Sequence, residues 1–205
     1  MLALLLLTTS CAGAGVTAST SASSLIVDAT NAALFNDLTD GQSLLGYEED
    51  GVRVSVNRTY YNWDVPGLDS SGMFYPNTGS LELVDISRSS GADFQDLDMQ
   101  IASGWSPESI GTVFVWVQLY NDGSLVQEFD IDMLAGSYLG FAGGGFDQVL
   151  IGSYVNAERR DLHNPFERNA IAIDNLRLGT LVPAPASTAM LGLGLLMGTR
   201  RRRSC

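Results

Sequence analysis

The side chains best suited to bind a ligand are aromatic and lie in turn-rich stretches of the sequence. Tyr61 and Trp63 belong to the run YYNW at 60–63, and Tyr75 and Trp105 follow further along the chain. Sugar rings stack their apolar C–H faces on such rings, while nearby Asn and Asp side chains bind the hydroxyls in a concave site. These four residues form the predicted ligand site. The alternative is that the rings cover the ends of the fold or fill its core.

Acidic side chains form three clusters that offer oxygen ligands to a hard cation. They are Glu48-Glu49-Asp50, Asp93 with Asp96 and Asp98, and Asp130 with Asp132. Ca²⁺ takes about six to eight oxygen ligands from carboxylates and carbonyls, but no segment has the spacing of an EF-hand loop. The alternative is that these acids are solvated side chains at strand edges.

No spacing of residues predicts a catalytic site. With 23 acidic residues, a carboxylate pair for glycoside hydrolysis can always be drawn. His163 is the only histidine, it lies in a polar stretch typical of a surface loop, and no G-x-S-x-G motif is present. Gly143-Gly144-Gly145 precedes a predicted strand, which indicates a loop rather than a phosphate-binding turn. The sequence therefore predicts a non-enzymatic protein that requires no cofactor.

The charge distribution argues against a nucleic-acid partner. The chain of 205 residues has a formal net charge of −12 and no lysine, and four of its 11 arginines are Arg200 to Arg203. The remainder carries seven arginines against 23 acidic residues. Such a surface repels phosphate backbones and anionic lipid. It suits solubility or cation binding.

The elements that must position these side chains are short strands. Apolar and polar residues alternate with period two, or β-rich runs occur, at 24–29, 51–57, 80–86, 94–102, 112–120, 124–134, 146–154 and 169–179. The step from Phe94 to Leu97 breaks the period and predicts a bulge, and Asn121-Asp122-Gly123 predicts a hairpin turn. Residues 31–38 are expected to form a short helical segment, Leu81 and Leu83 to share one strand face, and Trp116 to lie in the core.

This pattern predicts one all-β domain over residues 24–179. Many short strands separated by Gly, Asn and Asp turns are typical of an antiparallel β-sandwich, and we expect a jelly roll. Both cysteines, Cys11 and Cys205, lie near the chain ends, so we expect no disulfide within the domain.

The first 23 residues are expected to be a secretory signal peptide. A short apolar run precedes small residues, and Ala12-Gly13-Ala14 is an A-x-A-like site that predicts cleavage after Ala14. Lipidation of Cys11 is the alternative, although Thr stands where such a motif normally has Leu.

Residues 180–205 are expected to form a sorting and anchoring signal. The apolar run 187–199 would span about 20 Å as a helix, against a hydrocarbon core of about 30 Å. Snorkelling arginine side chains extend it. A cationic block after the run holds that end on the cytoplasmic side, so the domain lies on the outer side.

This tail resembles the PEP-CTERM sorting signal, although Ala stands where the family has Glu. The resemblance implies export and cleavage by an exosortase-type membrane peptidase, and an ordinary anchor helix is the alternative. The residues that match are Val182, Pro183, Ala184, Pro185, Arg200, Arg201, Arg202 and Arg203.

The stretches 34–52, 143–154 and 170–179 resemble carbohydrate-binding-module-like jelly rolls. That second resemblance implies a structural Ca²⁺ at Asp174, with Asp28 or Glu48 as partners. We therefore expect an exported, surface-sorted protein of the extracellular matrix that binds polysaccharide and not nucleic acid. It is anchored by its C-terminal helix before processing. The alternatives are a secreted hydrolase acting on polysaccharide and a purely structural matrix protein stabilised by Ca²⁺.

Overall fold

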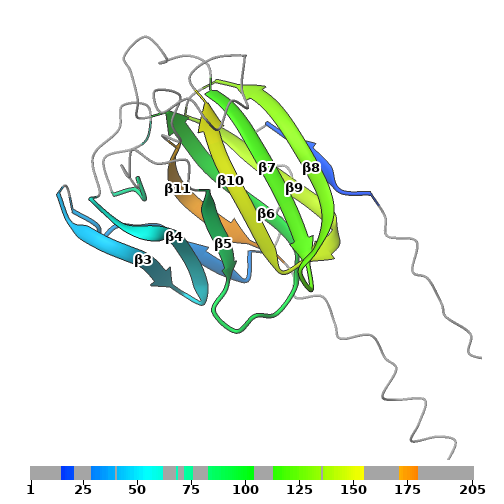
Figure 1. Ribbon diagram of the computed structural model, residues 1–205, viewed down its shortest axis with the longest axis horizontal. Coiled ribbons are helices and arrows are strands. Elements are labelled where there is room, and N and C mark those ends of the chain that lie inside the picture. The colour runs from blue at the N-terminus through cyan, green and yellow to red at the C-terminus, as the bar shows by residue number, and fades with distance from the viewer. Residues whose placement is uncertain are drawn as a thin grey trace, which may run out of the picture.

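The described part of the chain folds into two antiparallel sheets that share one hydrophobic core (Figure 1). The computed structural model describes residues 15–20, 29–39, 41–61, 68, 72–75, 83–103, 113–134, 136–154 and 171–179. Within these ranges all regular elements are strands. This is the architecture of a β-sandwich, as predicted.

The two sheets take strands from distant parts of the chain. The five-stranded sheet has the order β1 (Thr17–Ser19), β9 (Ser137–Phe146), β6 (Phe94–Ser103), β11 (Ile171–Leu178) and β2 (Asn31–Ala33). The six-stranded sheet has the order β3 (Ser43–Glu49), β4 (Val52–Tyr61), β5 (Val84–Arg88), β10 (Gln148–Tyr154), β7 (Val113–Asn121) and β8 (Ser124–Met133). Figure 1 shows the six-stranded sheet as one layer, with β6, β9 and β11 behind it.

Period-two alternation correctly predicts several core faces. In β4, Val52, Val54 and Val56 are buried, and the exposed Arg53 lies between the first two. Strand β7 buries Val115, Val117 and Leu119, the face opposite to the predicted core residue Trp116. The bulge near Phe94 is confirmed, because the β6–β9 register shifts between Phe94 and Asp96. The β7–β8 hairpin also forms as predicted, with positive φ at Asp122 and Gly123.

Other local predictions are wrong. Residues 31–38 form no helix; β2 and a turn take their place. Strand β5 is out of phase with the prediction, since Val84 and Ile86 are fully buried whereas Leu83 is only half-buried. Gly143 to Gly145, predicted to form a loop, lie inside β9 with φ values of 97°, 94° and 76°. Between the pairs Phe94–Phe146 and Asp96–Ala142, these three glycines of β9 lie opposite the single residue Gln95 of β6, so the extra residues of the bulge are on β9.

Both predicted end segments fall largely outside the described residues. This applies to residues 1–14, to the sorting tail from residue 180 onward, and to the predicted strand at 24–28. In the described ranges, no helix is long and apolar enough to cross a membrane. Strand β1 begins at Thr17, before the predicted domain start at residue 24, and pairs with β9.

Candidate functional site

Of the four aromatic residues in the predicted ligand site, Tyr75 is the one whose side chain the structure describes. Tyr75 is only 4% exposed and packs in a cluster with Met73, Ala102 and Ala172. Burial also raises the pKa of its phenol. The Tyr75 ring therefore fills the interior, the alternative to a role in ligand binding. Neither face of the ring is accessible for stacking on a sugar. Trp63, Trp105 and the side chain of Tyr61 lie outside the described residues.

The predicted calcium ligands occupy different sheets. Glu48 is exposed on β3 and forms an ion pair with Arg53 at 3.5 Å. The nearby Ser89 side chain, together with the charge of Arg53, lowers the pKa of Glu48. Asp174 is fully buried on β11, where its Oδ1 accepts a hydrogen bond from the Asn175 backbone at 2.6 Å. Asp28 lies outside the described residues, and the described part holds no group of three or more potential metal-binding His, Cys, Asp or Glu residues.

Other members of the acidic clusters bind protein donors. Glu49 Oε2 accepts hydrogen bonds from the backbone N–H groups of Leu34 at 2.8 Å and Phe35 at 3.0 Å. Asp50 Oδ2 accepts one from Ala32 at 3.1 Å. These two carboxylates accept from one backbone donor in the edge strand β2 and from two directly after it, and so they join the two sheets. In the five-stranded sheet, both oxygens of buried Asp98 accept hydrogen bonds from the Arg177 guanidinium.

The strongest candidate site lies on the outer face of the six-stranded sheet. Its side chains alternate along the strands with the buried residues Val54, Ile86, Leu119 and Val149, so they point away from the core. Registered pairs then place them in rows across the sheet, from Glu48 through Arg53 and Ser87 to Gln148 and Tyr120. We call this surface the polar face; it comprises Glu48, Arg53, Ser55, Asp85, Ser87, Gln118, Tyr120, Glu128 and Gln148.

Amide–carboxylate pairs orient the side chains of the polar face. Gln148 Nε2 donates to Asp85 Oδ2 at 2.7 Å, and Gln118 Nε2 donates to Glu128 Oε2 at 2.9 Å. The Tyr120 hydroxyl donates to Gln118 Oε1 at 3.1 Å. The groups are therefore held in fixed directions while they remain half-buried at the surface. Such an array can bind several hydroxyl groups at once with little loss of side-chain entropy.

The polar face is hollowed at its β3–β4 end. A pocket of about 330 Å³ is lined by Leu45, Gly46, Tyr47, Glu48, Arg53 and Ser55. The β3–β4 register shifts between Leu44 and Gly46. A Cβ at Gly46 would lie 3.1 Å from the Val54 carbonyl oxygen, so glycine here relieves a tight approach of the two strands. The ion pair of Glu48 and Arg53 lies at this hollow.

Trp116 lies on the same outer surface. The prediction that it lies in the core is wrong. It is half-buried and alternates with the buried Val115 and Val117. Its registered neighbours are Gly152 on β10 and the exposed Asp130 on β8. An aromatic ring therefore lies one row beyond Gln118, next to a residue without a side chain.

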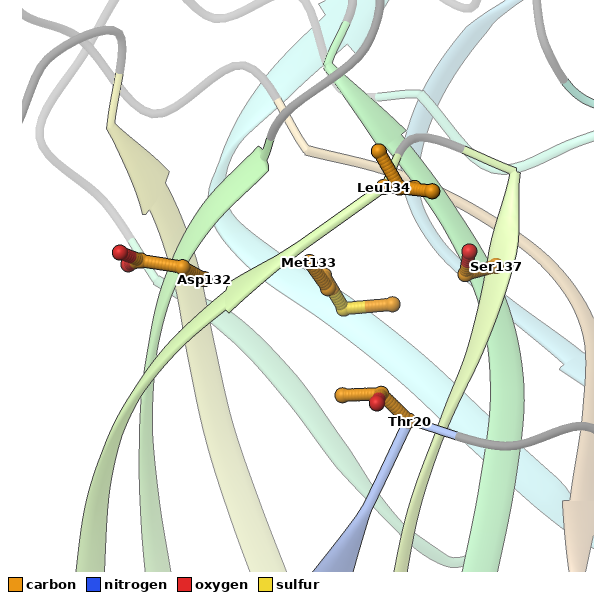
Figure 2. Close-up of a pocket in the computed structure, with 5 residues that line it drawn as sticks. All are labelled: Thr20, Asp132, Met133, Leu134 and Ser137. Carbon is orange, nitrogen blue, oxygen red and sulfur yellow. The ribbon is translucent and has the colours of Figure 1, made fainter.

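A second pocket, of about 430 Å³, lies between β1, β8 and β9 (Figure 2). It is lined by Thr20, Asp132, Met133, Leu134 and Ser137. Figure 2 shows Met133 pointing into this space toward Thr20, while the Asp132 carboxylate points away. The lining thus offers two hydroxyl groups and apolar surface, a poorer set for orienting a polar ligand than the polar face.

Asp85 is a member of the polar face whose ionised carboxylate is disfavoured by its surroundings. Burial raises the pKa of its carboxyl, and the charge of Asp147 adds to this, whereas the Gln148 hydrogen bond and Arg53 oppose it. Its Oδ1 is buried and accepts no hydrogen bond. The ionised form is thus less stable in the folded protein than in the unfolded chain.

We expect Asp85→Asn to stabilise the protein at neutral pH by about 1 kcal/mol, because it removes a desolvated charge and keeps the acceptor for Gln148. A raised folded pKa means that the native state binds more protons, so wild-type stability falls as pH rises above about 3.9, the unfolded value. Thermal melts of both proteins should converge below that pH. A gap that persists at acidic pH would contradict this origin.

Comparison with known proteins adds no family assignment. The chain matches no model of a known protein family, and it matches no curated protein sequence.

Proposed function

We propose that this protein is an exported, non-enzymatic component of the extracellular matrix that is sorted to the cell surface and binds polysaccharide. The observation that carries the binding part is the polar face, where oriented amides and carboxylates lie beside a hollow and a half-buried Trp116. Carbohydrate hydroxyls both donate and accept hydrogen bonds, and such a face offers both kinds of partner.

The finer architecture proposed for the domain is a jelly roll similar to carbohydrate-binding modules. The chain moves between the sheets repeatedly, from β5 to β6, from β8 to β9, and again at β10 and β11. Non-sequential strand neighbours of this kind support that topology.

Export is proposed to begin with cleavage of the signal peptide after Ala14. Strand β1 starts at Thr17 and pairs with Gly140 to Ala142, so cleavage at this point keeps β1 in the mature domain. The partly buried Val16 and Ala18, which pack against the main core, would be retained as well. At the other end, the sorting tail 180–205 anchors the chain in the membrane until an exosortase-type peptidase processes it.

Replacing Arg200 to Arg203 by glutamine should abolish sorting. Without fixed positive charge, the apolar run no longer has a cytoplasmic stop, and the chain should appear unprocessed in the medium. Cell fractionation with mass measurement of the product checks this. Replacement of the same four arginines by lysine keeps the charge and should keep processing. Recovery of the wild-type chain from the cytosol with both ends uncut would contradict the proposal.

Polysaccharide binding can be tested by affinity electrophoresis of the exported protein in gels that contain neutral, amino or acidic polysaccharides. We expect retention in at least one gel. Gln118→Leu should weaken it about tenfold, because it removes an amide that binds a charged partner and is available to the ligand. Gln127→Leu makes the same change at an exposed position off the polar face and should leave binding unchanged. No retention in any gel, or equal losses in both variants, would reject the binding function.

A further inference from the structure

We infer that the hollow at the β3–β4 end of the polar face holds one neutral sugar unit through two adjacent hydroxyl groups. This inference rests on the proposed function and specifies its ligand. The hollow has a volume of about 330 Å³. That volume is at the lower end of the range for small-molecule sites, about 300–1,000 Å³, and therefore suits a single sugar unit. Strands β3 and β4 form one edge of the six-stranded sheet, so the rest of a polysaccharide can extend from the hollow across the polar face (Figure 1).

The shape of the hollow follows from the missing side chain of Gly46. Gly46 is registered with Ser55, and Glu48 is registered with Arg53 two residues away along the same strands. This step is roughly 7 Å, so one sugar ring can reach both Ser55 and the ion pair. On the other side of Gly46 the β3–β4 register shifts, and Leu45 is 66% exposed, the largest exposed fraction of the large apolar side chains in the described ranges. An apolar side chain at the rim of a polar hollow can cover the C–H face of a sugar.

The two charges at the hollow balance each other. Glu48 and Arg53 form an ion pair of 3.5 Å, and each side chain is about half exposed. Ser89 and Arg53 lower the pKa of Glu48, so its carboxylate is ionised and accepts hydrogen bonds at neutral pH. The contact with Glu48 engages one nitrogen of a guanidinium that has five N–H donors. The pair thus presents an acceptor and a donor side by side, with no net charge for a ligand to neutralise.

Two adjacent hydroxyl groups of a sugar match this pair. One hydroxyl donates to the Glu48 carboxylate while its neighbour accepts from the Arg53 guanidinium, and both hydrogen bonds are of the stronger, charge-assisted kind. An ammonium group would compete with Arg53 for Glu48, and a carboxylate would compete with Glu48 for Arg53. Either ligand leaves one protein charge without its partner, so the site favours a neutral sugar.

The ligand class can be tested by NMR titration of the exported protein with single methyl glycosides. The neutral probes are the methyl glycosides of glucose, mannose and galactose, and the charged probes are those of glucosamine and glucuronic acid. At least one neutral glycoside should shift the amide signals of Gly46, Glu48 and Arg53. It should also bind at least about fivefold more tightly than either charged glycoside.

Two outcomes of this titration would overturn the inference. One is a charged glycoside that binds as tightly as the best neutral one, and the other is the absence of shifts at these three amides. Retention of the protein in a polysaccharide gel would in either case leave the proposed function intact. No glycoside binding together with no retention in any gel would reject both.

Monodeoxy analogues of the best neutral glycoside test the pair of hydroxyl groups. Removal of either of two adjacent hydroxyls should weaken binding at least about tenfold, because a charged side chain then loses its hydrogen-bond partner in the complex. The inference fails if no two adjacent positions show this loss.

Substitution of Arg53 tests the position of the site. Arg53→Met removes the donor and should weaken binding of the best neutral glycoside about tenfold. Gln127→Leu changes an exposed side chain off the polar face and should alter the affinity less than about twofold. Both side chains are exposed, so both variants should fold, and their amide spectra check this. Equal affinities of the two variants would overturn the inference.

Discussion

Replacing Arg88 by methionine should destabilise the protein by about 2–4 kcal/mol and lower its melting temperature by roughly 5–15 °C. Arg88 ends β5 and is only 5% exposed. Its guanidinium donates to Asn31 Oδ1, to Thr30 Oγ1 at 2.9 Å, and to the Gly179 carbonyl oxygen. These acceptors belong to or adjoin β2 and β11, so one side chain joins the six-stranded sheet to the five-stranded sheet.

The magnitude follows from what the substitution leaves behind. The buried Gly179 carbonyl loses its charged donor and keeps only the Thr30 hydroxyl, at 2.9 Å, and a hydrogen bond to a charged group contributes about 1.5–3 kcal/mol. The Phe94 ring, whose centroid lies 5.8 Å from Arg88 Cζ, also loses a cation–π partner. Burial lowers the pKa of the guanidinium, and methionine removes that desolvation penalty, which limits the net loss.

Arg53→Met is the matched control for this prediction. Arg53 makes an exposed ion pair with Glu48, and such pairs contribute at most about 1 kcal/mol. The two variants lose the same charge and gain the same side chain, so a difference in thermal melting measures the inter-sheet contacts of Arg88. Equal shifts in melting temperature would contradict the role given to Arg88.

The alternation of side chains was sufficient to predict strands wherever one face is apolar and the other polar. Val52, Val54 and Val56 make β4 unambiguous, because a one-residue slip would expose all of them. Strand β7 shows the limit of the same argument. Both of its faces are largely apolar, so the sequence could not decide whether Val115 or Trp116 faces the core, and only the pairing with β10 and β8 settles it.

The elements that were missed form through distant partners. Strand β2 is three residues long and is fixed by pairing with β11 and by the carboxylates of Glu49 and Asp50, none of which local propensity can represent. Strand β9 contains Gly143 to Gly145, which have low strand propensity, yet it pairs with β1 and β6. Tertiary contacts outweigh local preference in both cases.

The polar face could not be found from sequence for a related reason. Arg53, Asp85 and Gln148 lie on three strands that are far apart in the chain, and no spacing connects them. Their proximity depends on the order β4–β5–β10, which is a property of the topology. Alternation alone puts Arg53 on an outer face, between the buried Val52 and Val54, but the wrong phase predicted for β5 did not put Asp85 there.

Gly72→Ala should have the largest effect of any single methyl group added to the described residues. Gly72 has φ of +131°, and a Cβ there would lie 2.2 Å from the Phe35 carbonyl oxygen and 2.9 Å from its carbon. Both obstacles are backbone atoms, so no side-chain rotation relieves the contact. Phe35 is fully buried and its ring packs on Phe74, which in turn exchanges backbone hydrogen bonds with Ile173 at 2.8 and 2.9 Å.

Relief of that overlap requires either the Phe35 backbone or the 72–75 segment to move, and each movement opens the core or breaks the bridge to β11. We therefore expect a loss above about 4 kcal/mol, enough to prevent accumulation of folded protein. Gly91→Ala provides the control, because Gly91 also has positive φ, +70°, but nothing lies within 4 Å of its Cβ position. That variant should lose only about 1 kcal/mol from backbone strain. Urea unfolding of both proteins measures the difference, and similar midpoints would mean that φ strain alone, without the steric overlap at Phe35, determines the effect at Gly72.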